Sequence, residues 1–223
     1  MGLILNLETS STNCSVSLCN HGEILVFKED NDKGYSHAEK LHVFIDDVIS
    51  ESGFTKNDIE AIAVSKGPGS YTGLRIGVSA AKGLCFALDV PLISISTLEA
   101  LAHQVKIEEG FIVPMMDARR MEAYTAVFDF DYNIQRSVKA EILSEISFQE
   151  YLNRSKVYFI GSAVEKTKAL IDHKNASFLK NKFPSASTMG VLSYMKFKKS
   201  NFEDVAYFEP YYLKDFVAIK PKG

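Results

Sequence analysis

Residues 67–84 read GPGSYTGLRIGVSAAKGL, and this glycine-rich stretch is the most informative part of the chain. A mostly apolar run at 59–64 precedes it, as is typical of a strand buried on both faces, and helical spacing follows over 72–88. Backbone amides at such a strand-to-helix turn can bind phosphate or carboxylate. The stretch has no P-loop lysine, however, and Thr72 stands where the dinucleotide pattern needs its third glycine. The turn alone is therefore weak evidence for a nucleotide site.

Small residues recur along the helix that this stretch begins. Gly73, Gly77 and Ala81 follow one another at four-residue spacing. A glycine inside a helix costs about 1 kcal/mol relative to alanine. We therefore expect another backbone to approach this ridge closely, either within the domain or across a subunit contact, and the spacing does not choose between the two.

The chain around this stretch contains the same order of elements twice. The first copy has three strands, a helix, a strand and a helix at 3–8, 13–19, 23–29, 36–52, 59–64 and 72–88. The second has the same elements at 111–116, 122–130, 135–142, 147–153, 157–160 and 164–173. Further elements are expected at 91–95 (strand), 97–105 (helix), 176–179 (short apolar piece) and 187–198 (helix). The pattern predicts an α/β protein of two βββαβα halves, at 1–106 and 107–223, with the boundary in KIEEG (106–110).

Composition describes a globular chain with no targeting segment. Hydrophobic residues make up 46% and charged residues 24%, and no stretch approaches the ~18 apolar residues of a membrane span. The three cysteines form no metal or disulfide pattern, so we expect a cytoplasmic protein with no membrane contact. The net charge of -3 argues against coating nucleic acid by bulk electrostatics.

A polar turn follows the first strand of each half. Glu8, Thr9 and Ser10 stand in the first turn, and Asp117 and Arg119 in the second. Facing a cleft, such turns could hold a magnesium-phosphate group, with a carboxylate orienting metal or water. Polar hairpin turns are also common without any ligand, and spacing alone favours that interpretation.

The sequence contains no recognisable motif for metal binding or for hydrolase chemistry. His37 and His42 are five residues apart, about 140° around a helix, so they cannot share a metal. Neither a Gly-x-Ser-x-Gly elbow nor a His-Glu-x-x-His pair is present. We therefore expect no metal site and no catalytic residue.

Four stretches together resemble the TsaB (YeaZ) family: ILNLETSSTNCSVSL (4–18), SHAEKL (36–41), GPGSYTGLRIGVSAAKGL (67–84) and PMMDARRMEAY (114–124). The resemblance covers most of the first half and the opening of the second, and thins after about residue 130. It implies the actin, Hsp70 and sugar-kinase (ASKHA) fold, with two halves around a cleft, in agreement with the duplication. Two departures stand out: Glu8 replaces the usual Asp, and Tyr71 stands where Phe is common.

The resemblance also implies a function. TsaB-like proteins are understood as non-catalytic partners of TsaD, which transfers a threonylcarbamoyl group to adenosine 37 of tRNA, with TsaE joining at their junction. This chain lacks a His-x-x-x-His motif, and Gly161 is part of only an incomplete glycine pair. The resemblance further implies a homodimer when alone, contact with tRNA only through the complex, and ADP or ATP only at the subunit junction. The superfamily name glycoprotease has no chemical support here.

We expect the partner surface on the two first-half helices. The candidate interface residues are Ser36, His37, Leu41, Phe44, Ile45, Tyr71, Thr72, Gly73, Arg75, Gly77 and Ala81. On this hypothesis Gly77→Leu abolishes TsaD binding and leaves the monomer folded. The alternative is an active actin-like ATPase or kinase that binds nucleotide in its own cleft through Thr9, Ser10 and Asp117. A third possibility is a homodimeric binding module with no further role.

Overall fold

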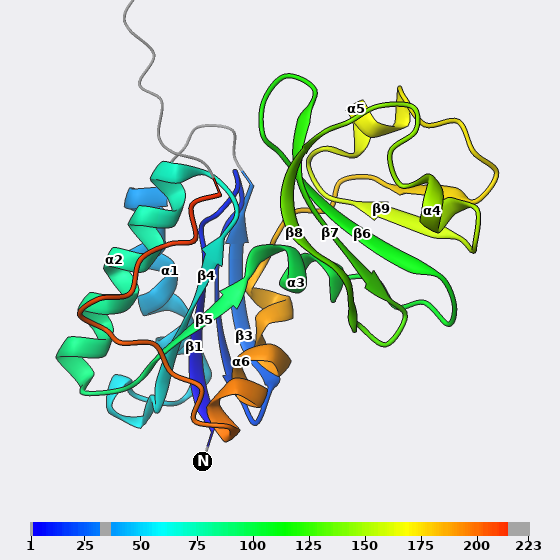
Figure 1. The fold of residues 1–223 in the computed structure, drawn as a ribbon. Coiled ribbons are helices and arrows are strands. Elements are labelled where there is room, and N and C mark those ends of the chain that lie inside the picture. Colours follow the sequence, from blue (N-terminus) through cyan, green and yellow to red (C-terminus); the bar gives the residue numbers. More distant parts are fainter. Residues whose placement is uncertain (1, 32–36, 214–223) are drawn as a thin grey trace, which may run out of the picture.

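Two five-stranded sheets organise the residues that the computed structural model describes, 2–31 and 37–213 (Figure 1). The first sheet has the order β3-β2-β1-β4-β5. Its strands are β1 (Leu3–Glu8), β2 (Cys14–Asn20), β3 (Glu23–Asp30), β4 (Ala61–Gly67) and β5 (Leu92–Ser96). β1 pairs antiparallel with β2 and parallel with β4, so the opening meander and the later crossover strands share one sheet.

The second sheet repeats this topology. Its order is β10-β9-β6-β7-β8, again with an antiparallel meander beside two parallel strands. The strands are β6 (Phe111–Asp117), β7 (Glu122–Asp129), β8 (Ile134–Ile142), β9 (Val157–Ile160) and β10 (Ala176–Leu179). The expected duplication of βββαβα halves is therefore confirmed.

Helices cover both faces of the first sheet. α1 (His37–Ser52) and α2 (Tyr71–Leu88) pack on one face, and α6 (Met189–Lys198), preceded by the 3-10 turn η2 (Ala186–Thr188), packs on the other. Alternation along β1 supplies both layers: Leu5 belongs to the α1/α2 core and Ile4 to the α6 core. β1 is buried on both faces, although Asn6 interrupts its apolar run, and so is most of β4, as its mostly apolar run predicts.

The second sheet has a thinner cover. α4 (Gln149–Leu152) and α5 (Val164–Lys168) are short helices on one face. Its other face packs on α3 (Thr97–Ala102), where Leu98 and Leu101 meet Ile112 and Phe128. α3 therefore lies between the lobes and joins their cores (Figure 1).

The expected second half, 107–223, needs a correction. After β10 the chain returns to the first lobe, where α6 contacts β5 and β1. Residues 201–213, here named the C-terminal strap, then run along the β5 edge: the Glu203 amide donates to the Leu92 carbonyl (2.9 Å) and the Tyr211 amide to the Lys66 carbonyl (2.7 Å). In Figure 1 this orange-to-red segment lies beside α2. The α6 face of the first sheet is apolar and needs a cover, but the element pattern does not say which segment provides it.

Most element boundaries agree with the sequence pattern to within three residues. The helices expected at 147–153 and 164–173 are shorter, at Gln149–Leu152 and Val164–Lys168, and the helix expected at 97–105 ends at Ala102. Phe148 adopts a left-handed φ of 63°, so a helix cannot extend back through it. A further 3-10 turn, η1 (Lys56–Asp58), precedes β4.

The N-terminal end of α1 lies at the edge of the described residues. Ser36, one of the expected interface residues, lies outside the described residues, and α1 is described from His37. None of the helices in the described part of the chain is both long and apolar enough to span a membrane.

Candidate functional site: two equivalent turns and a helical face

The β1–β2 turn is closed off from solvent. Glu8, Thr9 and Ser10 have at most 1% of their surface exposed. The Thr9 hydroxyl donates to the Gly73 carbonyl (2.7 Å), and the Ser70 amide donates to the Ser10 carbonyl (2.7 Å). The first turn of α2 is thus tied directly onto this loop.

α1 and the segment after β10 complete the enclosure. His37, 4% exposed, donates from Nε2 to the Ser11 carbonyl (2.6 Å). The Asn13 amide group donates to the Pro184 carbonyl (2.9 Å). α2, α1 and the segment after β10 all contact the turn, so its polar atoms form hydrogen bonds within the lobe.

Glu8 points into this enclosed region. Its Oε1 accepts from the Ser10 amide (2.6 Å), while Oε2 has no hydrogen-bond partner among the described residues. Burial raises the pKa of the Glu8 carboxyl, and the neighbouring Ser10 and Ser65 hydroxyls only partly offset that rise. A magnesium-phosphate role for Glu8, Thr9 and Ser10 requires accessible atoms, so this arrangement contradicts it.

The equivalent β6–β7 turn is open. The Asp117 side chain is 49% exposed, pairs with Lys166 (3.1 Å) and accepts from the Arg119 amide (2.6 Å). Arg119 and Arg120 both have left-handed φ values, 69° and 49°. Gly161 lies behind the turn with φ +116°, and a Cβ there would stand 2.1 Å from the Met115 carbonyl oxygen. Gly161 therefore has a packing role.

The two turns are not joined by direct polar contacts among the described residues. Within residues 2–31 and 37–213, no hydrogen bond or ion pair joins the first turn to the second. The same residues contain no group of three His, Cys, Asp or Glu side chains placed to hold a metal ion. Burial also raises the pKa of Cys14 to about 11 and that of Cys85 to about 12, so neither is an activated thiol.

The glycine ridge of α2 faces inward. A Cβ at Gly73 would stand 2.0 Å from the Thr9 carbonyl oxygen, and one at Gly77 would stand 2.3 Å from Thr9 Oγ1. Ala81 is fully buried. The close approach that the spacing predicts occurs within the lobe, so these three residues are not an outer surface. The expectation that Gly77→Leu leaves the monomer folded is wrong for the same reason.

Several other expected interface residues also belong to the core. Leu41 is 0% and Ile45 4% exposed, and both pack between α1 and the sheet, with half-buried Phe44 beside them. The helical spacing correctly indicates that they share a face, but that face meets the chain's own sheet. Thr72 and Arg75 are exposed, and the Arg75 guanidinium lies 4.7 Å above the centre of the half-buried Tyr71 ring.

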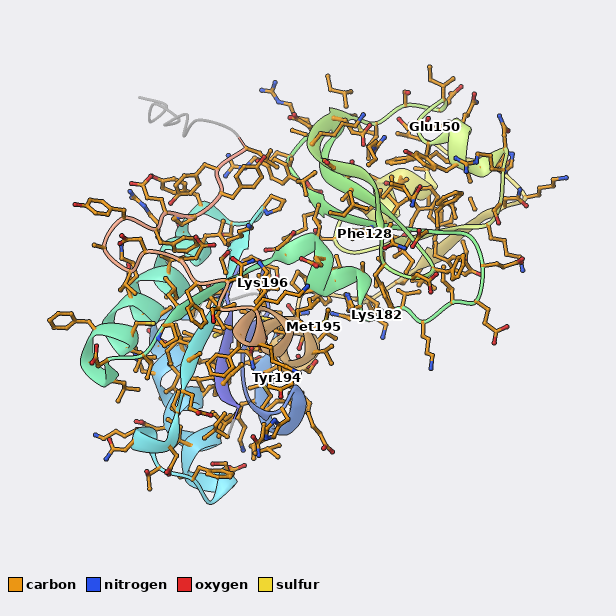
Figure 2. All side chains as sticks on the ribbon, turned by 60° about the horizontal axis from the view of Figure 1, so that its bottom comes forward. Phe128, Glu150, Lys182, Tyr194, Met195 and Lys196 are labelled. Carbon is orange, nitrogen blue, oxygen red and sulfur yellow. The ribbon has the colours of Figure 1, made fainter. Side chains whose placement is uncertain are left out.

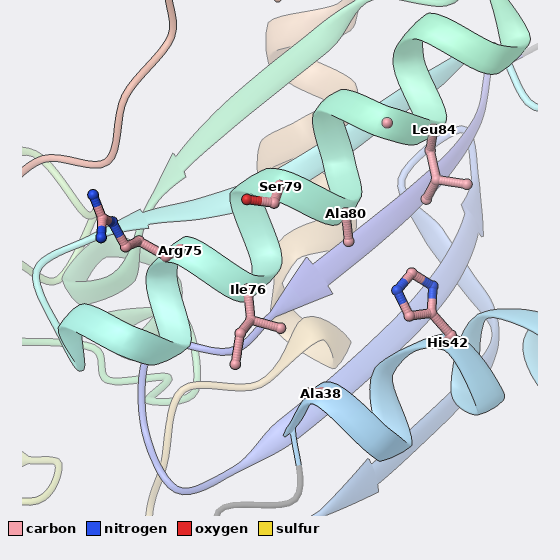
Figure 3. Close-up of a pocket in the computed structure, with 8 residues that line it drawn as sticks. Ala38, His42, Arg75, Ile76, Ser79, Ala80 and Leu84 are labelled. Atoms are coloured by element: carbon pink, nitrogen blue, oxygen red, sulfur yellow. The ribbon is translucent and has the colours of Figure 1, made fainter.

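The outward faces of α1 and α2 enclose a shallow groove of about 580 Å³ (Figure 3). This α1–α2 groove is lined by Ala38, His42, Arg75, Ile76, Ser79, Ala80, Gly83 and Leu84. Among the expected interface residues that the structure describes, Arg75 alone lines it. Ser79, Ala80 and Gly83 were missed because they flank the more regular glycine ridge. The exposed positions of Ser79 and Gly83, and the half-buried position of Ala80 between the helices, follow once Gly73 and Gly77 are known to face inward.

Duplicated sheets in this order, with equivalent turns after β1 and β6, define a protein of the actin, Hsp70 and sugar-kinase class. A family model described as "TsaD: tRNA N6-adenosine threonylcarbamoyltransferase" matches residues 33–221. The chain belongs to this family, in its TsaB (YeaZ) branch.

Individual relatives agree with that assignment. The tRNA threonylcarbamoyladenosine biosynthesis protein TsaB of Escherichia coli K12 is 29% identical over 97% of this chain and 96% of its own length. Its Bacillus subtilis 168 namesake is also 29% identical, over 76% of this chain and 75% of its own. The solved structure of YeaZ from Pseudomonas aeruginosa shares the fold, with a TM-score of 0.83 and 23% identity over 96% of this chain and all of that one.

Proposed function

We propose that this chain is a non-catalytic subunit in tRNA threonylcarbamoyladenosine biosynthesis that binds and activates a TsaD-type transferase. The names of the relatives support the pathway. The enclosure of the β1–β2 turn supports the non-catalytic role, because the Thr9 hydroxyl and the Ser10 carbonyl bond to the start of α2 and both residues are buried. A cytoplasmic location, a TsaE contact and a homodimer in the absence of TsaD belong to the same proposal.

The α1–α2 groove is the surface we propose for TsaD. Its small side chains, Ser79, Ala80 and Gly83, allow a partner helix to approach closely, and space beside Gly83 is open to at least 4 Å from a Cβ. Apolar area lies next to it, with Phe86 88% and Val43 55% exposed. Exposed apolar groups of this kind on helices are typical of protein interfaces.

Arg75 is the polar anchor of this surface. Its guanidinium covers one side of Tyr71, and the Tyr71 ring in turn packs against Tyr212 of the C-terminal strap, with ring centres 5.0 Å apart. The stack restrains an otherwise mobile side chain, and arginine and tyrosine are enriched among residues that dominate binding energy. Binding here would stabilise the working conformation of TsaD, and the coupling between the two proteins would be reciprocal.

The test is association of purified TsaD with the chain and with Gly83→Arg. The substitution fills the α1–α2 groove without touching the core, so we expect association to weaken about 100-fold, or about 2.7 kcal/mol, while thermal stability is kept or raised because a helical glycine is replaced. Val191→Arg, at a 55% exposed position on α6, is the matched control and should bind normally. Wild-type affinity of Gly83→Arg for TsaD would reject the α1–α2 groove as the interface.

The biological role is tested in the cell. Replacing the gene with the Gly83→Arg form should lower threonylcarbamoyladenosine in tRNA, measured by mass spectrometry of nucleosides, while Val191→Arg should not. The alternative, a nucleotide-cleft ATPase or kinase, predicts that the isolated chain binds ATP and Mg²⁺ and that Thr9→Ala and Asp117→Ala remove that binding. Calorimetry with the isolated chain decides between the two, and we expect no binding that depends on Thr9.

A further inference from the structure

A second groove, of about 340 Å³, lies between the lobes and is separate from the α1–α2 groove. The first lobe contributes Lys66 from β4, with Ser96 and Glu99 at the start of α3. The second lobe contributes Phe128 from β7 and Val138 from β8, and the C-terminal strap contributes Tyr211. This volume lies in the range of small-molecule sites, roughly 300–1,000 Å³. We name it the interlobe groove.

Lys66 and Glu99 are opposite charges that do not pair with each other. Both are half-buried, and neither side chain forms a hydrogen bond or ion pair of its own with any residue in the described ranges. The Glu99 amide, not its carboxylate, is the group that bonds to Ser96, as part of the α3 cap. A half-buried charge without a hydrogen bond or ion pair loses hydration and recovers only part of that cost from more distant charges, as Glu99 does from Lys196. Each of these groups is therefore available to a ligand.

The other charged groups around the interlobe groove already have partners. The Arg136 guanidinium donates to Thr125 Oγ1 (2.9 Å) and to the Glu141 carboxylate. Lys196, labelled on α6 in Figure 2, donates to the Ser94 carbonyl (2.7 Å), and Glu203 accepts from the Ser94 hydroxyl. A ligand in this groove thus meets the Lys66 ammonium and the Glu99 carboxylate, neither of which forms a hydrogen bond or ion pair among the residues that the structure describes, while the nearby Lys196 ammonium attracts Glu99 and repels Lys66 at longer range.

This pair of charges selects the kind of ligand. An anion attracted by Lys66 is repelled by Glu99, and a cation attracted by Glu99 is repelled by Lys66. A molecule that carries both a carboxylate and an ammonium group satisfies both at once. The wall on β7 and β8 includes the apolar side chains Ala126, Phe128, Ile134 and Val138, beside the polar Ser137 and Arg136, so this part of the groove suits a hydrocarbon or aromatic side chain.

We propose that the interlobe groove binds a free α-amino acid with an apolar side chain. Lys66 holds the carboxylate, Glu99 holds the ammonium group, and the side chain lies against Phe128 and Val138. Because the groove has one wall on each lobe, the bound ligand connects them and favours one relative lobe arrangement. Ligand binding to the folded state also stabilises it by mass action.

The first test uses the full chain without TsaD, so its outcome does not depend on the proposed interface. L-leucine and L-phenylalanine are titrated by calorimetry at millimolar concentration, and amide shifts at Ser96 and Val138 are followed by NMR. N-acetyl-leucine lacks the ammonium charge and leucinamide lacks the carboxylate. We expect both derivatives to bind about tenfold or more weakly than leucine. Equal binding of the derivatives, or no heat and no shift with either amino acid, overturns the proposal.

The second test determines whether Lys66 and Glu99 are the residues that bind the two charged groups of the ligand. Glu99→Gln and Lys66→Met keep the length of the side chains, and each should weaken leucine binding about tenfold or more. Glu150→Gln and Lys182→Met are matched controls on exposed side chains that do not line the interlobe groove (Figure 2), and both should bind as the wild type does. Wild-type affinity in Glu99→Gln and Lys66→Met would show that any binding lies elsewhere. If a variant is unstable, the acetyl and amide derivatives still test each charge on the wild-type chain.

Discussion

The β1–β2 and β6–β7 turns occupy equivalent places in two copies of one topology, yet one is enclosed and the other open. Ser10 in the first turn is 0% exposed, while the Asp117 side chain in the second is 49% exposed. The difference follows from the helices. α1 and α2 have 16 and 18 residues and reach the first turn, whereas α4 and α5 have four and five.

The long helices of the first lobe thus enclose a loop that would otherwise be open to a ligand, and the loop instead holds the two helices in place. In the first lobe, Thr9 and Ser11 bond to α2 and α1, so the loop fixes the positions of the two helices that carry the proposed TsaD surface. In the second lobe, the turn is held by Lys166, which donates to the Arg120 carbonyl (3.1 Å) and pairs with Asp117. The comparison indicates that the first turn serves an interface indirectly, by positioning, and the following substitutions test it.

The largest effect is expected where the first turn meets α2. Gly73→Ala would place a Cβ 2.0 Å from the Thr9 carbonyl oxygen, and neither backbone segment can move away cheaply. We expect a loss of about 3 kcal/mol in the free energy of unfolding, measured by urea titration. Gly83→Ala is the matched control in the same helix. It meets open space and should gain up to about 1 kcal/mol. Equal changes in the free energy of unfolding for Gly73→Ala and Gly83→Ala would contradict the close packing of α2 on the first turn.

A smaller effect, with a defined pH dependence, is expected at Glu8. Burial raises the folded-state pKa of its carboxyl above the unfolded value, so the folded state binds more protons between those two values. Stability therefore decreases as pH rises through this window, by up to about 1.4 kcal/mol per pH unit. Glu8→Gln can still accept from the Ser10 amide but does not titrate, so its stability relative to wild type should increase over the same window.

The measurement for Glu8 is urea unfolding at a series of pH values. Glu145→Gln, on an exposed side chain of the second lobe, provides the reference and should run parallel to wild type. A Glu8→Gln curve that also runs parallel to wild type would mean that the carboxyl titrates normally and that the first turn is open to water.

The smallest effect is expected in the open turn. Arg119 and Arg120 both hold left-handed backbone conformations that Asn and Gly adopt more readily. The free energy of unfolding of the double variant Arg119→Asn/Arg120→Gly, measured by thermal unfolding, should be about 1 kcal/mol higher than that of the wild type. His21→Asn, at φ 52° in the first lobe, is the comparison: it removes the His21–Tyr194 hydrogen bond (2.8 Å) and should show no gain. A loss of stability in the double variant would reveal contacts of the arginine side chains that support the turn.

The sequence predicts the element order well because local signals mark it. His21-Gly22 marks the hairpin between β2 and β3, where both residues have positive φ values. The apolar run of β4 marks a strand covered on both faces. It does not predict the partner of each face. Leu41 and Ile45 share a helical face, as their spacing requires, but nothing local distinguishes a core from an interface.

The site is less predictable because it depends on contacts between distant segments. The enclosure of the first turn needs bonds from Ser11 to His37, from Thr9 to Gly73 and from Asn13 to Pro184, which is 171 residues away. The interlobe groove likewise combines Lys66 and Glu99 with β7 and β8. Spacing within one helix cannot reveal such combinations.

The return of the chain to the first lobe has a consequence for biosynthesis. α6 and the C-terminal strap leave the ribosome after the entire second lobe, yet they cover one face of the first sheet and the edge of β5. Until they emerge, Ile4, Ile93 and Ile95 on that face lack their α6 cover, and the nascent first lobe is exposed to aggregation or chaperone capture. The first lobe is thus translated before the second lobe but completed after it.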